Sequence, residues 1–402
     1  MGRTGAGLVL AVLVVAALGA GYLAVSSGRY TTIVTSQSYT SSSTAAGSTP
    51  LWIYRANGAI TSVSVSENGN YTVVAEQVFF NNSGGAILLF NRAGDLLWER
   101  QTDWVVSDAA ISDNGSHILA LGHKFLYGPG QPTSQANEVF ALDSNGSVLW
   151  NTTSSSPYYG GAMSTDGSRV AVFTDDYVAL LTWSGQVLWN DSAAGADFCP
   201  GVGPCPVFVS QDGSVVAAGH QGITLFNPDG SVAWTFTRTD GETNNVWANS
   251  VTLTSSGYLI AAAQDSNFND TALLLTGQGV PLWEHHLDSQ VFSAALLQDG
   301  STIGYVTDSS ALFYDRNGTL LANYTTDGEL TLLPTSNGTF LLGGGGNDLA
   351  LFDSAGQERW SSPLQTVLTA AVSGDDAFVA ATTGARGEGA LGPSTLYFFS
   401  TS

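Results

Sequence analysis

Eight short segments that end in a tight turn and a tryptophan position recur along this chain. Seven of the eight carry Gly four residues before the tryptophan position, and only Ala322 replaces the Trp. Self-similarity at a period of about 40–50 residues indicates a repeat architecture. The eight copies are STPLW (48–52), GDLLW (94–98), GSVLW (146–150), GQVLW (185–189), GSVAW (230–234), GVPLW (279–283), GTLLA (318–322) and GQERW (356–360).

A second tight turn recurs once in each unit, and most copies contain Asn-Gly or Asp-Gly. These pairs supply the positive φ that tight hairpins need. Short runs rich in Val, Leu, Ile, Ala and Phe lie around the turns, as is typical of β-strands. No window after residue 26 shows sustained helical periodicity. The turns are SENGN (66–70), SDNGS (112–116), STDGS (164–168), SQDGS (210–214), SSGY (255–258), QDGS (298–301), SNGT (336–339) and SGDDA (373–377).

Each unit therefore predicts four antiparallel strands, A to D, with the second kind of turn joining A to B and the Gly turn before the Trp joining C to D. Four strands per unit predict an all-β fold, an eight-bladed β-propeller of four-stranded antiparallel blades. The last unit contains only three strands, so we expect residues 50–55 to pair with the strand near 395–399 and close the ring. Because Ala322 replaces a Trp, we expect that blade contact to bury less apolar surface.

The Gly turn followed by an apolar pair or Leu-Trp, over residues 50–402, resembles the pyrroloquinoline-quinone-type (PQQ-like) propeller repeat. The A–B turns also resemble the Ser-x-Asp-Gly turns of TolB- and WD-type propellers. The resemblance implies that the repeat Trp residues pack between neighbouring blades. It also implies one enzymatic alternative, a quinoprotein-like oxidoreductase that uses the central channel.

The N-terminus predicts export. Residues 5–25 are uncharged and mostly apolar, which is enough to span a bilayer, and Arg3 favours a cytoplasmic N-terminus. We expect one transmembrane helix, an uncleaved signal anchor over residues 1–26, followed by a Ser/Thr-rich stalk over 27–49 and the propeller over 50–402. The alternative is a cleaved signal peptide and a secreted protein, although no clean cleavage site follows.

Charge excludes one class of partner. The formal net charge is −22, and Lys124 is the only lysine, whereas a nucleic-acid-binding protein needs a basic footprint. Charged residues make up only 11% of the chain, with abundant Ser, Thr, Asn and Gly in their place. This composition fits an envelope protein of an archaeon or a bacterium, and we favour an archaeal one.

Two features fit an extracellular setting. Cys199 and Cys205 are the only cysteines, and we expect them to form a loop disulfide. Because they are not adjacent, the redox disulfide of the resembling quinoprotein dehydrogenases is not carried over to them. Ten N-x-[ST] sequons are candidate glycosylation sites, although turn chemistry alone also produces this motif: Asn70, Asn81, Asn114, Asn145, Asn151, Asn190, Asn269, Asn317, Asn323 and Asn337.

Motifs of catalysis are missing from the sequence. It contains no G-x-S-x-G elbow, no H-E-x-x-H and no Walker loop. His285 and His286 are adjacent on a predicted strand and therefore point to opposite faces. We assign no catalytic residue, no metal site and no cofactor.

Loop length gives the best functional indication. The A–B and C–D turns are short, whereas the B–C and D–A connections, on the opposite face, include long segments such as 123–138 and 191–206. Repeat proteins place insertions on the binding face, and aromatic side chains in such loops favour recognition of a protein or a glycan. The alternative is that these aromatics pack their own loops. The candidate binding residues are Trp104, Phe125, Tyr127, Tyr158, Tyr159, Phe198 and Trp247.

These observations predict a membrane-anchored extracellular propeller that binds a protein or glycan partner and catalyses nothing. The stalk enters at the start of a D strand, so the tight turns face the membrane and the long connections face outward. Two alternatives are the quinoprotein-like oxidoreductase and a surface-layer or filament subunit that assembles with copies of itself.

Overall fold

The structure, a computed structural model, describes residues 49–78, 84–128, 131–154, 159–174, 177–191, 207–210, 212–219, 222–236, 247–254, 259–265, 270–287, 289–326, 331–343, 349–364, 366–384, 386–387, 390–391 and 393–402. Every regular element within these residues is a β-strand, so the all-β prediction is confirmed. The expected signal anchor, and the stalk up to residue 48, lie outside the described residues. In the part that is described, no helix is long and apolar enough to cross a membrane.

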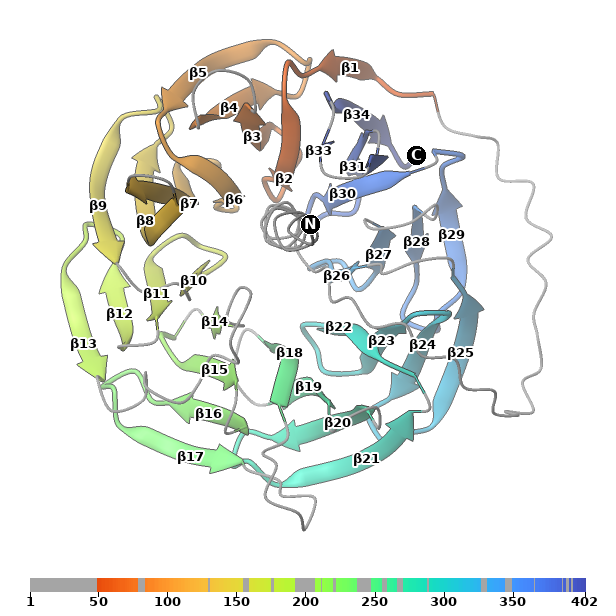
Figure 1. Ribbon diagram of the computed structural model, residues 1–402. Coiled ribbons are helices and arrows are strands. Elements are labelled where there is room, and N and C mark those ends of the chain that lie inside the picture. The colour runs from red at the N-terminus through yellow and green to blue at the C-terminus, as the bar shows by residue number, and fades with distance from the viewer. Residues whose placement is uncertain are drawn as a thin grey trace, which may run out of the picture.

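The described strands form eight four-stranded antiparallel sheets, arranged as a ring with the first strand of each sheet nearest the axis (Figure 1). Sheets 1 to 3 are β2 (Ala59–Val65), β3 (Tyr71–Val78), β4 (Gly84–Asn91) and β5 (Leu96–Thr102); β6 (Val105–Ile111), β7 (His117–Gly128), β8 (Gln131–Asp143) and β9 (Val148–Ser154); and β10 (Tyr159–Met163), β11 (Arg169–Thr174), β12 (Val178–Thr182) and β13 (Val187–Asp191).

The remaining sheets repeat this order around the ring. Sheets 4 to 7 are β14 (Val207–Val209), β15 (Val215–Gly219), β16 (Gly222–Phe226) and β17 (Val232–Phe236); β18 (Trp247–Leu253), β19 (Leu259–Asp265), β20 (Asp270–Thr276) and β21 (Pro281–Leu287); β22 (Val291–Leu296), β23 (Thr302–Thr307), β24 (Ser310–Asp315) and β25 (Leu320–Thr325); and β26 (Thr331–Pro334), β27 (Phe340–Gly343), β28 (Ala350–Phe352) and β29 (Glu358–Ser361). Sheet 8 is β30 (Val367–Val372), β31 (Phe378–Thr383), β34 (Thr395–Ser400) and β1 (Trp52–Arg55), and a small ribbon, β32 (Arg386–Gly387) and β33 (Ala390–Leu391), lies in the connection between β31 and β34.

The N-terminal strand closes the ring. β1 pairs antiparallel with β34, with Trp52 opposite Phe398 and Arg55 opposite Thr395, and the Leu51 amide donates to the Phe398 carbonyl at 2.7 Å. The closure predicted from the incomplete last unit is therefore confirmed. Without β1, β34 would present an unpaired edge.

The core lies between the sheets. The described residues contain eight clusters of buried apolar side chains, and each cluster combines residues of two neighbouring sheets. Successive side chains of a strand point to opposite faces of its sheet, so each sheet packs one face against the sheet before it and the other face against the sheet after it. Each sheet is thus stabilised by two neighbours, which explains why the ring needs closing.

Two sets of aromatic contacts reinforce these junctions. In the first, the Trp of a D strand lies on the Gly of the next sheet's C–D turn: a Cβ on Gly94, which has φ +88°, would lie 2.6 Å from Trp52 Cγ. The Trp52 indole Nε1 donates to the Arg92 carbonyl of that turn at 2.9 Å. The packing of the Trp residues between blades is confirmed. The same contact joins Trp98 to Gly146, Trp150 to Gly185, Trp189 to Gly230, Trp234 to Gly279 and Trp283 to Gly318.

In the second set, the first side chain of a B strand lies on the Gly of the next sheet's A–B turn. Phe378 covers Gly69, and Tyr71 covers Gly115. Because these glycines have positive φ and no room for a Cβ, both requirements select Gly. These two turns are contact sites for the preceding sheet, whereas a Cβ at Gly338, in the A–B turn of sheet 7, would meet nothing within 4 Å.

The unit with Ala322 carries its aromatic ring on another strand. Phe313 lies opposite Ala322 on the neighbouring strand β24, is fully buried, and packs with Ala322 against Gly356. In sheets 1 and 5 the residue at the place of Phe313 is Leu, at Leu89 and Leu274. Phe313 therefore places an aromatic ring at this junction, one strand inward from the Trp position. That the junction buries less apolar surface than the others stays a prediction.

Candidate binding face

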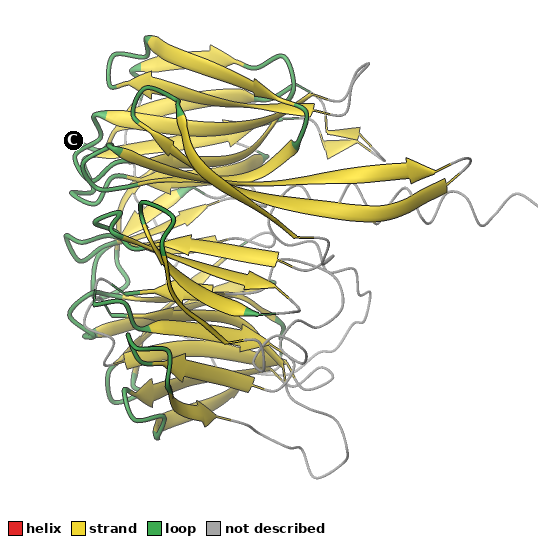
Figure 2. Cartoon of the chain, turned by 90° about the vertical axis from the view of Figure 1, so that its left-hand side faces the viewer, coloured by secondary structure: helices red, strands yellow, loops and turns green. Residues whose placement is uncertain are grey.

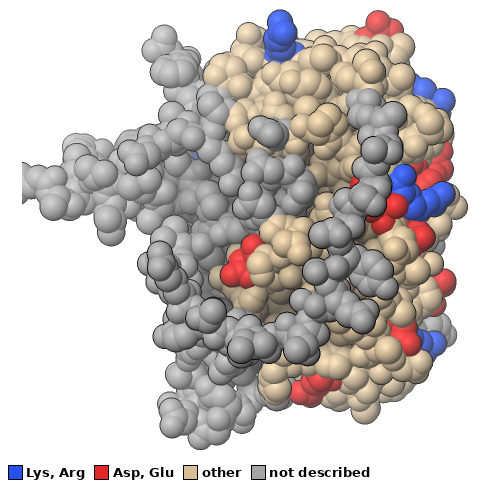
Figure 3. All heavy atoms as spheres, turned by 90° about the vertical axis from the view of Figure 1, so that its right-hand side faces the viewer, with Lys and Arg blue, Asp and Glu red and all other residues tan. Residues whose placement is uncertain are grey.

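The ring has two unlike faces. On one, which we call the tight-turn face, lie the A–B and C–D turns, short and green in Figure 2. On the other, which we call the connection face, lie the B–C connections and the D–A links between sheets. Charged side chains on the side of the ring in Figure 3 lie mostly toward the tight-turn edge. The wall between the faces is largely uncharged there.

An arm projects from the connection face. β7 and β8 are longer than the strands beside them and continue as a two-stranded ribbon, the long pair of arrows in Figure 2. Pairing runs from His123 opposite Asn137 to Gly128 opposite Gln131. Phe125 and Tyr127 were expected in a loop over 123–138, and that expectation is corrected: both lie in β7. Pairing ends at Gly128 opposite Gln131, and the two residues between them lie outside the described ones.

The base of the arm is anchored by Trp104. Its half-buried ring meets the edge of Phe140 with the ring centres 6.5 Å apart, and the Lys124 ammonium lies 5.7 Å from its centre. Lys124 also forms an ion pair with Asp103, and this hydrogen bond holds the pKa of the Asp103 carboxyl below its usual value. A cation over an aromatic ring is attracted to it. The arm is therefore fixed to the link between sheets 1 and 2.

Gly122 allows this close packing. A Cβ at Gly122 would lie 3.1 Å from Trp104 Cβ and 3.2 Å from a Phe140 ring atom. Trp104 thus packs against β7 and β8 of sheet 2 and presents only part of its ring to solvent. Of the seven candidate binding residues, it is the one whose side chain the structure describes.

Two buried titratable groups lie beside the arm. Glu138 is only 4% exposed; one carboxylate oxygen accepts from the Asn151 amide, whereas Oε2 is buried without a hydrogen-bond partner. Burial raises the pKa of Glu138 and lowers the pKa of His123 to about 4. Both groups therefore favour their neutral forms more than they would in water.

Asp103, His123, Lys124 and Glu138 were not among the candidate residues. One signal in the sequence was available, because Lys124 is the only lysine of the chain and lies next to the predicted Phe125. The contact with Asp103 required knowledge that β6 and β7 are neighbours.

The structure describes the remaining candidate binding residues only in part. Tyr159 begins β10 opposite Thr174, and Trp247 begins β18 opposite Asp265; only their backbones are described, as for Phe125 and Tyr127. Tyr158 and Phe198 lie outside the described residues, as do Cys199 and Cys205. The structure therefore brings Trp104, Phe125 and Tyr127 to one arm and leaves the grouping of the others as a prediction.

Most described sequon asparagines are exposed. Asn323 is half-buried, and its Oδ1 is buried without a partner. Two others use the amide that a glycan would occupy: Asn151 donates to Glu138, and Asn337 donates to Asp376. Asn81 and Asn269 lie outside the described residues. Exposed asparagines are Asn70, Asn114, Asn145, Asn151, Asn190, Asn317 and Asn337.

Among the described residues, no group of three or more His, Cys, Asp and Glu side chains lies close enough together to hold a metal ion. On the innermost strands, Asp108 accepts hydrogen bonds from the Ser62 hydroxyl at 2.5 Å and from the Ala109 amide at 2.8 Å. Desolvation by the surrounding protein raises the pKa of Asp108. These contacts are local to sheets 1 and 2.

Comparison with known proteins agrees with the repeat pattern. The family model described as outer membrane protein assembly factor BamB matches residues 4–164, 135–295 and 223–385. These overlapping matches together cover most of the chain. No curated protein sequence matches it significantly.

Solved structures with a similar fold include the Dos1 propeller and Sqt1 of Saccharomyces cerevisiae. The Dos1 propeller has a TM-score of 0.58 at 13% identity, covering 87% of this chain and 94% of that one. Sqt1 has a TM-score of 0.61 at 11% identity, covering 88% of this chain and all of that one (100%). At these identities the likeness shows a shared propeller fold.

Proposed function

The chain belongs to the PQQ-like β-propeller family of the outer membrane protein assembly factor BamB, and from this premise we propose that it is a non-enzymatic binding scaffold at a cell surface. In this proposal the eight sheets are the blades of an eight-bladed propeller, residues 1–26 anchor it in the membrane, and the connection face binds a protein or glycan partner. The observation that carries the proposal is the contrast between the two faces. The described tight turns follow one pattern, except for Asp376 in sheet 8, whereas the connections vary and include the arm.

The point at which the described chain enters β1 supports the orientation. Thr49 precedes β1, and β1 starts on the tight-turn face, as every D strand does. A segment that entered from a membrane at this point would place the tight-turn face toward the membrane and the arm away from it. Rigid scaffolds commonly carry binding residues on such outward connections.

Site-specific photo-crosslinking in intact cells tests the proposal. A photoreactive amino acid at Phe125 or Tyr127 should give crosslinks to one partner, whereas the same amino acid at Asn145 or Asp229, in tight turns, should give none. A few aromatic anchors usually dominate such interfaces, so alanine at Phe125 and Tyr127 together should weaken partner capture at least about tenfold. Crosslinks from the tight turns alone would contradict the proposed face.

Two further assays test the anchor and the absence of catalysis. The full-length protein should stay with membranes after an alkaline carbonate wash, and release by the wash would contradict an uncleaved anchor. Incubation with pyrroloquinoline quinone and Ca²⁺ should give no stoichiometric complex and no dye reduction. A tight complex with dye reduction would replace the scaffold by the oxidoreductase alternative.

A further inference from the structure

The arm has unpaired outer edges. β7 pairs with β6 only as far as His123, opposite Val105, and β8 pairs with β9 only as far as Asn137, opposite Ser154. Beyond these residues, the described part of the chain places no strand beside the arm. Residues 124–128 and 131–136 therefore present backbone N–H and C=O groups along two free edges.

A two-stranded ribbon with unpaired edges has little stability of its own. A two-stranded hairpin is marginally stable in water, and three or more strands are needed for independent stability. The ion pair of Lys124 and the packing of Trp104 hold only the base of the arm. An added strand along one edge would stabilise the rest.

The two edges are not equivalent. β8 contains Pro132, opposite Tyr127, and proline has no N–H to donate to a neighbouring strand. β7 contains no proline from Lys124 to Gly128. The edge of β7 is therefore the one with a full set of donors.

Charge indicates what could add to this edge. The chain carries a net charge of −22, yet no Asp or Glu occurs from Lys124 to Asn137. Two copies of the chain repel each other overall, and they meet with least repulsion where both lack acidic groups. An antiparallel contact of β7 with its own copy is also self-complementary, so one contact occupies the β7 edge of each arm.

We propose that two copies of this chain pair through the β7 edges of their arms, residues 124–128, about a twofold axis. The product is a four-stranded antiparallel sheet in the order β8, β7, β7 of the second copy, β8 of the second copy. This inference depends only on the arm and not on the membrane anchor or on the proposed partner. A strand of a different protein on the same edge is the competing outcome.

Cysteine crosslinking of the full-length protein in detergent tests the pairing. In the proposed sheet Leu126, at the centre of 124–128, lies near Leu126 of the second copy. Leu126→Cys should therefore give a covalent dimer under mild oxidation. The matched control is Ser134→Cys, because Ser134 lies opposite Leu126 in the same arm but on the other strand. Unmodified protein, with Cys199 and Cys205 only, gives the background.

A second measurement needs no cysteine. The unmodified protein should sediment as a dimer at micromolar concentration. Phe125→Pro removes a donor from the β7 edge, because alternate residues of β7 face away from β8 and Phe125 is one of them, so it should raise the dimer dissociation constant at least tenfold. Its melting temperature should stay close to that of the unmodified protein, since the ring is untouched. Monomers at these concentrations, equal crosslinking at 126 and 134, or crosslinking at 134 alone would overturn the proposal.

Discussion

The two junctions on either side of sheet 8 are held by different chemistry. Between sheets 8 and 1, Trp52 covers Gly94 and Phe378 covers Gly69, as at the other regular junctions. Between sheets 7 and 8, the described residues make neither contact. The third and fourth strands of sheet 8, β34 and β1, come from opposite ends of the sequence, so no C–D turn offers a glycine to Trp360.

The junction of sheets 8 and 1 is an aromatic column. Phe378 stacks on Phe398 with 5.5 Å between ring centres, Phe398 on Trp52 at 4.9 Å, and Trp52 on Phe90 at 5.6 Å. The Arg92 guanidinium lies 4.6 Å from the Phe378 ring centre and extends the column at one end. β1 thus contacts sheet 1 as well as β34.

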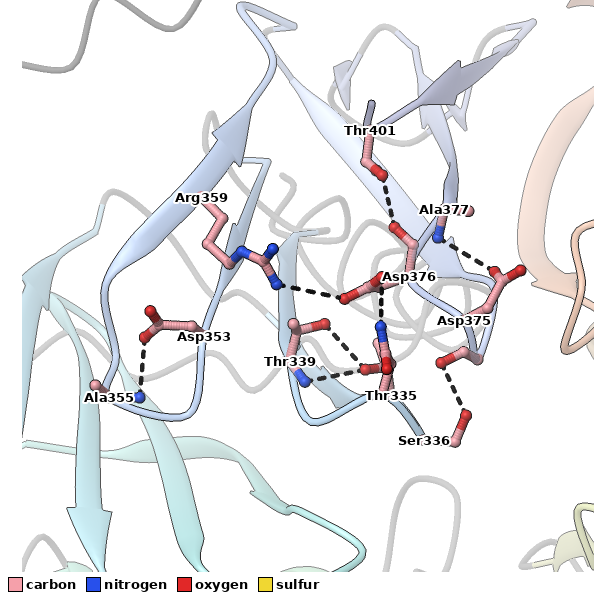
Figure 4. A network of polar contacts seen from close by, with 12 residues as sticks. Thr335, Ser336, Thr339, Asp353, Ala355, Arg359, Asp375, Asp376, Ala377 and Thr401 are labelled. Atoms are coloured by element: carbon pink, nitrogen blue, oxygen red, sulfur yellow. Dashed lines mark hydrogen bonds and ion pairs between the residues drawn. The ribbon is translucent and has the colours of Figure 1, made fainter.

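The junction of sheets 7 and 8 is polar around the A–B turn of sheet 8 (Figure 4). Asp376, with φ +53°, occupies the turn position that is Gly in other sheets. Its carboxylate accepts from the Asn337 amide at 3.0 Å and pairs with Arg359 at 3.8 Å, and its carbonyl accepts from the Thr401 hydroxyl at 2.7 Å. Trp360 turns inward and meets the edge of Phe399 at 5.7 Å.

The difference shows what the turn glycines are for. Where the preceding sheet lays an aromatic ring on a turn, the turn carries Gly; at Asp376, where polar side chains gather instead, a side chain is accommodated. Asp is among the residues that tolerate positive φ best. Ring packing therefore adds to the turn conformation as a reason for Gly at positions such as Gly69 and Gly94, whereas at Gly338 the positive φ acts alone.

Removal of β1 should have the largest effect. A chain that starts at residue 57 loses the strand opposite β34 and the Trp52 contacts, whereas a chain that starts at residue 49 keeps both. Since loss of one buried aromatic costs about 3–5 kcal/mol, we expect loss of the whole strand to lower the free energy of unfolding by at least about 5 kcal/mol. Thermal unfolding of the two truncated proteins measures the difference. Equal melting temperatures would mean that β1 does not hold the ring.

A pair of glycine substitutions sharpens the comparison next. Gly94 has a φ of +88°, and Gly94→Ala places a methyl group against Trp52. Gly338 has a φ of +82°, and the methyl group of Gly338→Ala meets nothing within 4 Å. Positive φ costs a non-glycine residue about 1–2 kcal/mol, and overpacking costs about 1–3 kcal/mol more. Gly94→Ala should therefore destabilise by about 2–5 kcal/mol and Gly338→Ala by about 1–2 kcal/mol in denaturant titrations. Equal costs would show that turn conformation alone selects Gly.

The sequence predicted the regular parts of this architecture well. Repeated turns, strand order and the use of residues 50–55 to complete the last sheet follow from periodicity and from counting strands. Phe313 was missed because its place beside Ala322 depends on which residues lie opposite each other across β24 and β25. The arm was missed because Gly, Pro, Ser and Gln are typical of loops, and only pairing along β7 and β8 distinguishes a ribbon from a loop.

The candidate binding site was harder to predict than the fold. Aromatic residues in long connections are easily found, but Trp104 packs with Lys124 and Phe140, contacts that depend on neighbouring strands. Contacts between distant residues, such as the hydrogen bond from Ser336 to Glu67, follow only once the ring is closed. Spatial neighbours in this fold come from the register of strands, which periodicity alone does not fix.

A smaller effect is expected where one side chain bridges both junctions. The Glu67 carboxylate of sheet 1 reaches across Gly374 of sheet 8 to accept from the Ser336 hydroxyl of sheet 7, and a Cβ at Gly374 would overlap that carboxylate. Gly374→Ala should displace Glu67 and cost about 1 kcal/mol, the usual net value of a hydrogen bond. In a Glu67→Ala background the same change should cost nothing. A double-mutant cycle measures the coupling, and full additivity would show that the bridge contributes nothing.

The smallest expected effect is a pH dependence of stability that arises at Asp113, in the A–B turn of sheet 2. Burial, then the charges of Glu67 and Asp166, raise the pKa of Asp113 to about 6 from an ordinary value of 3.8. Between about pH 4 and pH 6 the folded protein therefore binds more protons at Asp113 than the unfolded chain does, so stability falls as pH rises through this window. Asp113→Asn should remove that fall, raising the melting temperature at pH 7 and changing it little at pH 4.

Asp229, in the C–D turn of sheet 4, gives a control of opposite sign. Hydrogen bonds from Ser231 lower the pKa of Asp229, so its contribution is present above the ordinary pKa and is lost as pH falls through the lowered value. Asp229→Asn should therefore lower the melting temperature slightly at pH 7, with the difference disappearing at acidic pH. If both variants shifted the melting temperature in the same direction at pH 7, the burial of Asp113 and the charges of Glu67 and Asp166 would not be the cause of the Asp113 effect.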